Sequence, residues 1–421
     1  MPDAIILGIE SSCDETGAAV VRAGEQILSN VVASQIATHQ PYGGVVPELA
    51  SREHLRAILP VVRQSLAEAG HTYNSIDAIA VTQGPGLAGA LLVGISFAKA
   101  LSFALGKPLI AVNHLEGHVH AVLLEQRQSE NADLQFPVLA LVVSGGHTHL
   151  YLAEVDKNLW TYAEIGHTRD DAAGEAFDKV AKLLALGYPG GPIIDRLAPH
   201  GDPHAVKFQI AQIKHRDRNE MRNRVRNKVG SEVQDEVRSE LRDEVRSEVR
   251  SEASRSAAAL TSSEQNLRPR FDFSYSGIKT AVLRYVETEH LQPSIEQRRK
   301  ALQDIANPTF DDYLRLCDRQ TLNLVASFQR AIVTDLVTKT LAAAREYDVR
   351  TLFVSGGVAA NQELRTTFQR EAEMQGLPVF FPSRPLSTDN AAMIAAAAFP
   401  KFLRQDFAPA DFSAEANFPL R

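Results

Sequence analysis

Cysteine is nearly absent from this chain of 421 residues, which contains only Cys13 and Cys317. Two cysteines cannot build a disulfide framework, and they cannot supply the paired motifs of a cysteine-based zinc site. Their scarcity therefore excludes small disulfide-stapled folds and cysteine zinc folds. It fits a protein of the reducing cytoplasm, where we expect this chain to work.

Long apolar runs are also scarce. At the N-terminus only residues 4–9 are continuously apolar, and Glu10, Asp14 and Glu15 follow at once, which is not the pattern of a signal peptide. No apolar stretch is expected to reach the ~18 residues that cross a bilayer, so we predict no membrane span. A net charge of −7 argues against wholesale non-specific binding of nucleic acid but leaves a local basic patch possible.

The tetrapeptide Val-Ser-Gly-Gly occurs twice, at residues 143–146 and 354–357. Each copy follows a short apolar run, which is typical of a buried strand that ends in a tight loop. Glycine lets backbone N–H groups approach a phosphate closely. We interpret the two copies as phosphate-binding loops at equivalent positions of two lobes, with a nucleotide between them. Two unrelated tight turns are the alternative.

The two halves of the chain carry the same predicted succession of elements. In the first half we expect strands over 4–9 and 18–22 around a polar turn, a strand over 77–82, a helix over 87–105 and a strand over 108–112. In the second half we expect strands over 138–143, 149–155 and 351–354, a helix over 359–375 and a strand over 378–381. This repetition predicts an α/β fold of two duplicated lobes with a nucleotide cleft, and a single doubly wound sheet is the alternative.

We place the lobes at residues 1–135 and 136–385, and a C-terminal segment that closes the cleft at residues 386–421. Residues 205–268 read as a charged, low-complexity insertion in the second lobe. Its tetrapeptide repeat at residues 231–252 drifts by about 40° per repeat on a helix, so its valines cannot keep to one face. We favour a solvated expansion of a tolerant loop over an arm that binds RNA or a partner.

His114 and His118 stand four residues apart, which places both rings on one face of a helix, where they can share a metal ion. A packing or capping role for the pair is the alternative. Leu115 occupies the position that the glutamate of a HExxH peptidase requires, so peptidase chemistry is disfavoured. Asp389, ahead of an alanine-rich helix, either caps that helix or completes a His-His-Asp site suited to iron, zinc or manganese.

Two further stretches carry candidate ligand groups. Asp178 lies among apolar residues at helical spacing, where a carboxylate needs a partner such as a ligand hydroxyl or Lys182. The glycine loop that ends in Gly191 precedes a predicted helix start at residues 193–195, so its N–H groups form another donor site.

Seven stretches in this order together resemble the family of tRNA N6-adenosine threonylcarbamoyltransferases (TsaD). The matching stretches are residues 8–16, 113–118, 141–148, 174–191, 272–280, 354–361 and 387–390. The resemblance covers nearly the whole chain except residues 205–268. It implies the actin-like ATPase (ASKHA) fold, which agrees with the duplicated plan.

The resemblance also implies a ligand set and a reaction. The metal ligands would be His114, His118 and Asp389, with Fe(II) the usual assignment and zinc a second candidate. The residues implied to contact the nucleotide or acyl-adenylate are Val142, Val143, Ser144, Gly145, Gly146, Asp178, Gly191, Asp195 and Asn361. The reaction would transfer a threonylcarbamoyl group from threonylcarbamoyl-AMP to N6 of the adenosine 3′ of the anticodon, in tRNAs that read codons beginning with A.

The turn that carries Asp14 and Glu15 supplies our candidates for the group that accepts the proton of the attacking amine. The partners implied by the family are tRNA, a paralogous TsaB-like subunit and a TsaE-like ATPase, and a homodimer is expected for the chain alone. Two other functions stay open at this stage. A small-molecule kinase or ATPase of the same fold would not need the histidine pair, and a non-catalytic scaffold would bind nucleotide without modifying tRNA.

Overall fold

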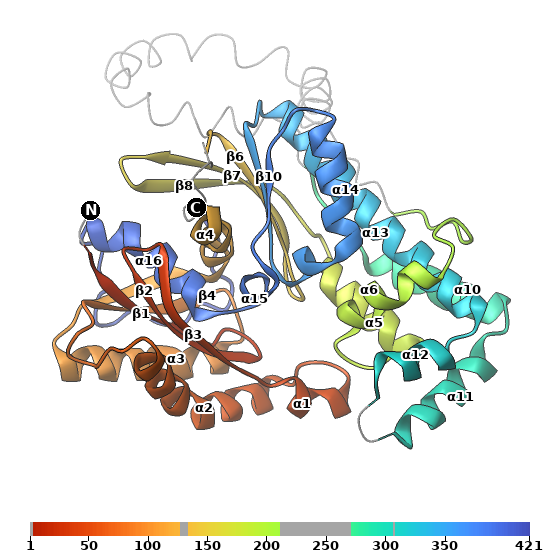
Figure 1. Cartoon of the computed structure of the whole chain (residues 1–421), viewed down its shortest axis with the longest axis horizontal. Helices are drawn as coiled ribbons and strands as arrows, with labels where there is room; N and C mark the ends of the chain where they lie inside the picture. Colours follow the sequence, from red (N-terminus) through yellow and green to blue (C-terminus); the bar gives the residue numbers. More distant parts are fainter. Residues whose placement is uncertain (1–2, 127–133, 211–270, 306–307) are drawn as a thin grey trace, which may run out of the picture. The chain divides into compact units, whose positions relative to one another are not determined.

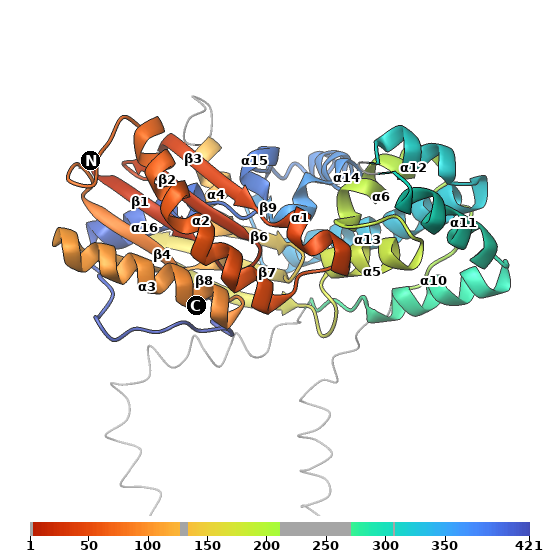
Figure 2. The same cartoon turned by 90° about the horizontal axis from the view of Figure 1, so that it is seen from below.

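The strands of this protein form two sheets of five strands each, as seen in a computed structural model that describes residues 3–126, 134–210, 271–305 and 308–421 (Figures 1 and 2). Sheet 1 has the order β3-β2-β1-β4-β5, with β1 (Ile5–Glu10), β2 (Glu15–Arg22), β3 (Gln26–Ser34), β4 (Ala78–Gly84) and β5 (Leu109–Asn113). Sheet 2 has the order β10-β9-β6-β7-β8, with β6 (Val138–Val143), β7 (Thr148–Asp156), β8 (Leu159–His167), β9 (Thr351–Ser355) and β10 (Val379–Phe380).

The second sheet repeats the topology of the first. In each sheet three consecutive strands pair antiparallel, and two later strands add in parallel to the free edge of the first strand. Thus β6, β9 and β10 correspond to β1, β4 and β5. The predicted α/β fold of two duplicated actin-like lobes is confirmed, and the alternative of a single doubly wound sheet is wrong.

The two Val-Ser-Gly-Gly loops do not occupy equivalent positions. The first copy follows β6, the counterpart of β1, whereas the second follows β9, the counterpart of β4. Both strands lie side by side in sheet 2, where Val142 pairs in parallel with Ser355. A Cβ on Gly356 would come within 2.4 Å of the Val143 carbonyl oxygen, so the loops are direct neighbours. The prediction of one loop per lobe is therefore wrong, because motif identity carries no information on strand neighbours.

Sheet 1 is covered on its two faces by four helices, which are α2 (Pro47–Glu68), α3 (Ala88–Leu105), α4 (His114–Gln126) and α16 (Ala391–Leu403). The short helix α1 (Ile36–His39) follows β3. Along β1, Ile5, Leu7 and Ile9 face α2 and α3, whereas Ile6 faces α16. Alternate residues of a strand point to opposite faces, so an uninterrupted apolar run predicts a strand that is covered on both sides.

Close packing of α16 against sheet 1 depends on two glycines. A Cβ on Gly8 would lie 2.3 Å from the Ala391 carbonyl oxygen, and a Cβ on Gly17 would lie 3.0 Å from the Ala391 nitrogen. Small residues on both sides therefore let the start of α16 contact the strands directly. This contact fixes the position of the preceding residue pair, Asp389 and Asn390.

One helix corrects an expectation from the sequence. Helix α3 has 18 residues with a mean hydropathy of 1.8, so by length and composition it is apolar enough to cross a membrane. Among the described residues it is the only helix of that kind. A single such helix is weak evidence for a membrane span, because core helices pass the same test. The inner face of α3 packs in the core beside sheet 1 through Leu91 and Ile95, and the helix also contains the charged residue Lys99.

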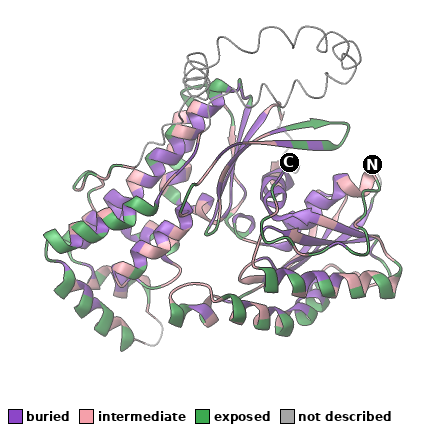
Figure 3. Cartoon of the chain, turned by 180° about the vertical axis from the view of Figure 1, so that it is seen from behind, coloured by how far each residue is buried: buried purple, intermediate pink, exposed green. Residues whose placement is uncertain are grey.

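The helices beside sheet 2 surround a long central helix, α13 (Arg319–Glu346). Asp318 caps α13 by accepting a hydrogen bond from the Thr321 nitrogen at 2.7 Å. The other helices are α5 (Ala173–Leu183), α6 (Gly190–Leu197), α10 (Ser276–Thr288), α11 (Gln292–Gln303), α12 (Phe310–Leu316), α14 (Gln362–Glu373) and α15 (Arg384–Ser387). Buried residues of α5, α13 and β6 share one apolar core (Figure 3).

Helix α4 joins the two sheets. Leu115, Val119 and Val122 on α4 pack with Val138 and Tyr151 of sheet 2, while Ala121 and Leu124 pack with α16. A helix that starts directly after β5 is thus held from both sides, which fixes the side chains of its first turn.

Several predicted boundaries change. The polar turn expected over 10–17 is shorter, because β2 already begins at Glu15, and β3, β8, α2 and α13 were not predicted. Most of the predicted insertion at 205–268 lies outside the described residues. Its described beginning packs on α13, where the Val206 nitrogen donates to Ser327 Oγ at 3.1 Å. The proposed lobe limits stay predictions.

Candidate functional site

His114 and His118 lie in the first turns of α4, where the step of four residues brings their rings together. The ring centroids are 4.7 Å apart and the planes are nearly perpendicular. Both side chains are buried. The predicted pairing on one helix face is therefore confirmed.

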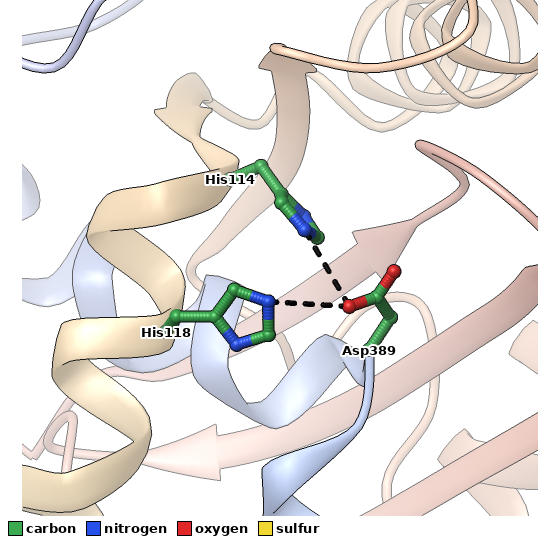
Figure 4. Close-up of side chains that lie close together, drawn as sticks. All are labelled: His114, His118 and Asp389. Carbon is green, nitrogen blue, oxygen red and sulfur yellow. Dashed lines mark ion pairs between the residues drawn. The ribbon is translucent and has the colours of Figure 1, made fainter. Parts of the chain in front are cut away.

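Asp389 approaches this pair from the loop between α15 and α16 (Figure 4). Its Oδ1 lies 3.5 Å from His114 Nε2 and 3.2 Å from His118 Nε2. Asp389 is not the cap of α16, because the side chain of Asn390 accepts the hydrogen bond from the Met393 nitrogen at 3.1 Å. Among the described residues, these three side chains are the only group of three or more histidine, cysteine or acidic residues close enough to share a metal ion.

The opposite nitrogen of the His114 ring is held by the end of β1. His114 Nδ1 lies 3.1 Å from Glu10 Oε2 and 3.2 Å from Ser12 Oγ. Glu10 in turn accepts hydrogen bonds from the Ser12 nitrogen at 2.5 Å and from Thr82 Oγ1 at 2.7 Å. A carboxylate that binds one ring nitrogen orients the other, so Nε2 is the nitrogen of His114 that would face a metal ion.

The charges of this cluster are strongly coupled. Burial lowers the pKa of His114, but Asp389 and Glu10 outweigh burial and hold the pKa of His114 well above its ordinary value. Burial raises the pKa of Asp389, but the His114 charge and the hydrogen bonds of both histidines hold it well below its ordinary value. The pKa of His118 is lowered, chiefly by burial. The site thus holds a carboxylate and a neutral imidazole side by side.

His118 shows that these residues fit a metal ion. Its side chain is fully buried, its Nδ1 has no hydrogen-bond partner among the described residues, and its Nε2 faces Asp389 Oδ1 at 3.2 Å. A buried imidazole without such partners costs free energy unless another group binds it. Two imidazole nitrogens and one carboxylate oxygen are a donor set that suits iron(II) or zinc.

The loop after β6 opens beside this triad. The His147 ring lies 6.0 Å from the His114 ring, and burial, followed by the nearby histidines, lowers the pKa of His147 to about 3. Gly145 and Gly146 are exposed, and a Cβ at either position would meet no protein atom within 4 Å. Packing within the protein therefore does not require glycine here, and the loop leaves room for a ligand.

The remaining predicted ligand residues surround the same edge of sheet 2. The Gly174 nitrogen at the start of α5 donates to the Ser144 carbonyl at 3.2 Å. Further along α5, Asp178 Oδ1 accepts from the Gly190 nitrogen at 2.7 Å, and the neighbouring Gly191 is open to a ligand. Burial raises the pKa of Asp178 to about 6.

Asp195 and Asn361 are partly committed to the fold. Asp195 accepts from the Gln362 nitrogen at 3.1 Å and thereby joins α6 to α14. Asn361 caps α14 by accepting from the Leu364 nitrogen at 2.9 Å, and its amide donates to Gln329 Oε1 at 2.8 Å. Their contacts with a ligand stay predictions.

Asp14 and Glu15 lie at the turn between β1 and β2. Tyr188, in the loop before α6, donates to Asp14 Oδ2 at 3.5 Å, which links this turn to the loops of sheet 2. Burial and the negative charge of Asp14 raise the pKa of Glu15 well above its ordinary value. A raised pKa makes a carboxylate a stronger base when it is ionised.

Comparison with known proteins gives the family. The family model described as "tRNA N6-adenosine threonylcarbamoyltransferase" (TsaD) matches residues 26–268 and 223–396. A protein of that name from Koribacter versatilis (strain Ellin345) is 65% identical over 421 residues, which covers 100% of both chains. The chain belongs to the tRNA N6-adenosine threonylcarbamoyltransferase family.

Other relatives agree with this assignment. A tRNA N6-adenosine threonylcarbamoyltransferase from Syntrophobacter fumaroxidans is 46% identical over 98% of this chain and 99% of its own length. Among solved structures, an activator of 2-hydroxyisocaproyl-CoA dehydratase from Clostridium difficile overlaps with 96% of this chain and 98% of its own at 11% identity and a TM-score of 0.42. That overlap is too weak to bear on function.

In this member of the tRNA N6-adenosine threonylcarbamoyltransferase family, the structure adds residues to the site that the sequence did not single out as site residues. Glu10, Ser12 and Thr82 orient His114, and His147 lies between the triad and the glycine loop. Glu10 carried one signal, an acidic residue at the end of an otherwise apolar buried strand. Ser12 and His147 lie in the stretches 8–16 and 141–148 that carry the family resemblance, whereas Thr82 carried no signal, because its role depends on a contact with a distant segment.

Proposed function

We propose that this chain transfers the threonylcarbamoyl group of threonylcarbamoyl-AMP to N6 of the adenosine 3′ of the anticodon, in tRNAs that read codons beginning with A. The product is N6-threonylcarbamoyladenosine. The observation that carries the proposal is the His114–His118–Asp389 triad, with both histidines buried, next to an open glycine loop. A kinase of the same fold has no use for that triad, and this distinguishes the two functions.

The triad would hold one divalent ion, iron(II) or zinc, through Nε2 of both histidines and a carboxylate oxygen of Asp389. When bound, the ion supplies a Lewis acid that polarises a carbonyl or phosphate oxygen. Glu10 keeps the His114 ring in the orientation that this binding requires.

The donor is a mixed anhydride, so AMP is a good leaving group and the protein mainly orients the reactants. The backbone N–H groups of Gly145 and Gly146 would bind the phosphate, and Val142, Val143 and Ser144 hold that loop at the end of β6. Asp178 and Asp195 would accept hydrogen bonds from ribose or adenine, with Gly191 and Asn361 beside them. Open space at Gly145, Gly146 and Gly191 supports this assignment.

The attacking N6 amine forms a bond to the carbamoyl carbon, the bond from that carbon to the phosphate oxygen breaks, and the amine loses one proton. Glu15 is our first candidate to accept this proton, because burial raises its pKa. Asp14, which lies beside it, is the second candidate or a supporting group.

Helices α2 and α3 carry an exposed apolar surface that suits a protein partner. Leu55, Leu59, Leu92 and Phe103 are large exposed apolar side chains on these two helices, and Phe103 is 92% exposed. Such a surface is typical of an interaction site. We propose that a TsaB-like paralogue binds to this surface in the cytoplasm. When the chain is alone, a second copy of it would bind there and form a homodimer. A TsaE-like ATPase would complete the assembly.

Mass analysis of tRNA nucleosides tests the activity. The protein is incubated with its partners, threonine, bicarbonate, ATP and the enzyme that makes the acyl-adenylate. We expect the threonylcarbamoyl mass on adenosine with the wild type and its loss with His118→Ala. Lys300→Ala, an exposed residue of α11 away from the triad and from the proposed partner surface, serves as a control for folding and metal content. Modification by a folded His118→Ala variant that lacks metal would refute the role of the triad.

A further inference from the structure

Helix α2 carries a buried histidine on its inner face that contacts the turn between β1 and β2. His54 is fully buried. Its Nε2 lies 3.0 Å from the Cys13 carbonyl oxygen, and its Nδ1 lies 2.8 Å from Thr16 Oγ1. The two residues that it binds stand directly before and after the pair Asp14 and Glu15.

The partners fix the protonation of the ring. A carbonyl oxygen only accepts hydrogen bonds, so Nε2 carries the hydrogen and donates to Cys13. In the neutral ring Nδ1 then accepts from the Thr16 hydroxyl. Burial lowers the pKa of His54 below its ordinary value, so the neutral form persists at neutral pH.

The two hydrogen bonds differ in importance for the turn. Thr16 already belongs to β2, where it pairs with Ala33 of β3. Cys13 lies outside the strands, and its carbonyl group belongs to the peptide bond that leads into Asp14. The bond from His54 to Cys13 is therefore the one that restrains the turn itself.

Three elements thus hold this turn from different sides. The Gln35 nitrogen donates to the Asp14 carbonyl at 3.0 Å, and the Leu87 nitrogen, just before α3, donates to the Ser12 carbonyl at 2.8 Å. His54 adds the restraint from α2. None of these three backbone restraints is a hydrogen bond to a metal ligand or to the glycine loop, although the Ser12 hydroxyl group also contacts His114.

We infer that His54 is a positioning residue, which fixes the backbone of the turn at Cys13 so that Asp14 and Glu15 face the reacting amine. This role rests on the proposed function for its catalytic consequence. Its structural part, the restraint of the turn, can be measured without activity. A displacement of about 1 Å at a catalytic group can lower a rate by about 100-fold.

Two conservative variants separate the two hydrogen bonds. His54→Gln places an amide N–H near the position of Nε2 and keeps the donor to Cys13, whereas His54→Asn places an oxygen near Nδ1 and keeps only the acceptor for Thr16. His54→Phe removes both bonds. Ser65→Ala is the matched control, because it removes a buried hydrogen bond of α2 to Ser29 that is remote from the turn.

The first readout is steady-state kinetics of the full assembly. We expect His54→Phe and His54→Asn to lower kcat by at least 10-fold, with KM for the donor and for tRNA within 2-fold of the wild type. His54→Gln should lose at most 3-fold in kcat, and Ser65→Ala should match the wild type. Metal content should be equal in all variants.

The second readout is the rate of alkylation of Cys13 in a Cys317→Ser background. Burial and the charge of Asp14 raise the pKa of the Cys13 thiol, so it reacts slowly in the intact turn. Loss of the bond from His54 should raise this rate at least 5-fold in His54→Asn and leave it unchanged in His54→Gln.

An unchanged alkylation rate in folded His54→Asn would overturn the positioning role, whatever its kcat. If His54→Phe fails to fold, the Asn and Gln variants decide the question. Faster alkylation in His54→Asn, in a protein whose wild type does not modify tRNA, would refute the proposed function and leave the restraint of the turn in place.

Discussion

Replacing Asp178 by asparagine tests the electrostatics of the candidate nucleotide site. Asp178 lies on α5, and its Oδ1 accepts a hydrogen bond from the Gly190 nitrogen at the start of α6. Asparagine keeps an oxygen at that position and can accept the same bond. The substitution therefore removes the buried negative charge and changes little else.

The expected effect follows from the pKa of this carboxyl group, which burial raises from 3.8 to about 6. Because the folded state holds the proton more tightly, Asp178 favours folding below its unfolded pKa, and this contribution is lost as the pH rises from about 4 to about 6. A shift of about 2 pKa units corresponds to about 3 kcal/mol in the free energy of unfolding over the whole titration. Between pH 4.5 and pH 7.5 the expected change is about 2 kcal/mol.

Urea unfolding of the wild type and of Asp178→Asn at both pH values measures this change. The change in the free energy of unfolding between the two pH values is compared for the two proteins, so the contributions of all other titrating groups cancel. We expect the variant to gain about 2 kcal/mol relative to the wild type on going from pH 4.5 to pH 7.5. Asp156→Asn, an exposed position at the end of β7, controls for the change in net charge. A gain for Asp178→Asn that does not depend on pH would refute the reasoning.

Four further predictions concern other parts of the molecule. Glu10→Gln should weaken metal binding by about 10–100-fold in equilibrium dialysis, because the His114 ring loses its orienting carboxylate. Arg298→Ala should lower the free energy of unfolding by about 4 kcal/mol in urea titrations, because the fully buried guanidinium donates to two otherwise buried carbonyl groups, and unchanged stability would contradict this. Gly145→Ala should leave stability within about 0.5 kcal/mol but raise KM for the acyl-adenylate, since the added methyl group contacts only the ligand space. Phe103→Glu should abolish co-purification with the paralogous partner without changing the metal content.

The secondary structure near the site could largely be predicted, because local patterns encode it. The apolar run at 138–143 gives β6 with the predicted bounds, and the alanine-rich segment after Asp389 gives α16. The spacing of His114 and His118 likewise sets their common helix face. Helix α2 and strand β3 were not predicted, although the buried residues of α2 recur every three to four positions between Ala50 and Leu66, which is the spacing of one helix face.

The arrangement of the site could be predicted only in part. Family resemblance joined Asp389 to the histidine pair, and the structure brings the three together. No pattern showed that Asn390, and not Asp389, caps α16, or that both Val-Ser-Gly-Gly loops belong to sheet 2. Cap identity depends on backbone angles, and strand neighbours depend on crossovers whose lengths leave several topologies possible.

The order of residues was enough to predict the duplicated α/β plan, the histidine pair on one helix face and the family. Each of these depends on periodicity and on the order of motifs along the chain. The contact of Glu10 with His114 and that of His54 with the turn before Asp14 became visible only in the folded chain. Hydrogen bonds between segments far apart in the chain depend on how sheets and helices pack, and that packing leaves no local trace in the order of residues.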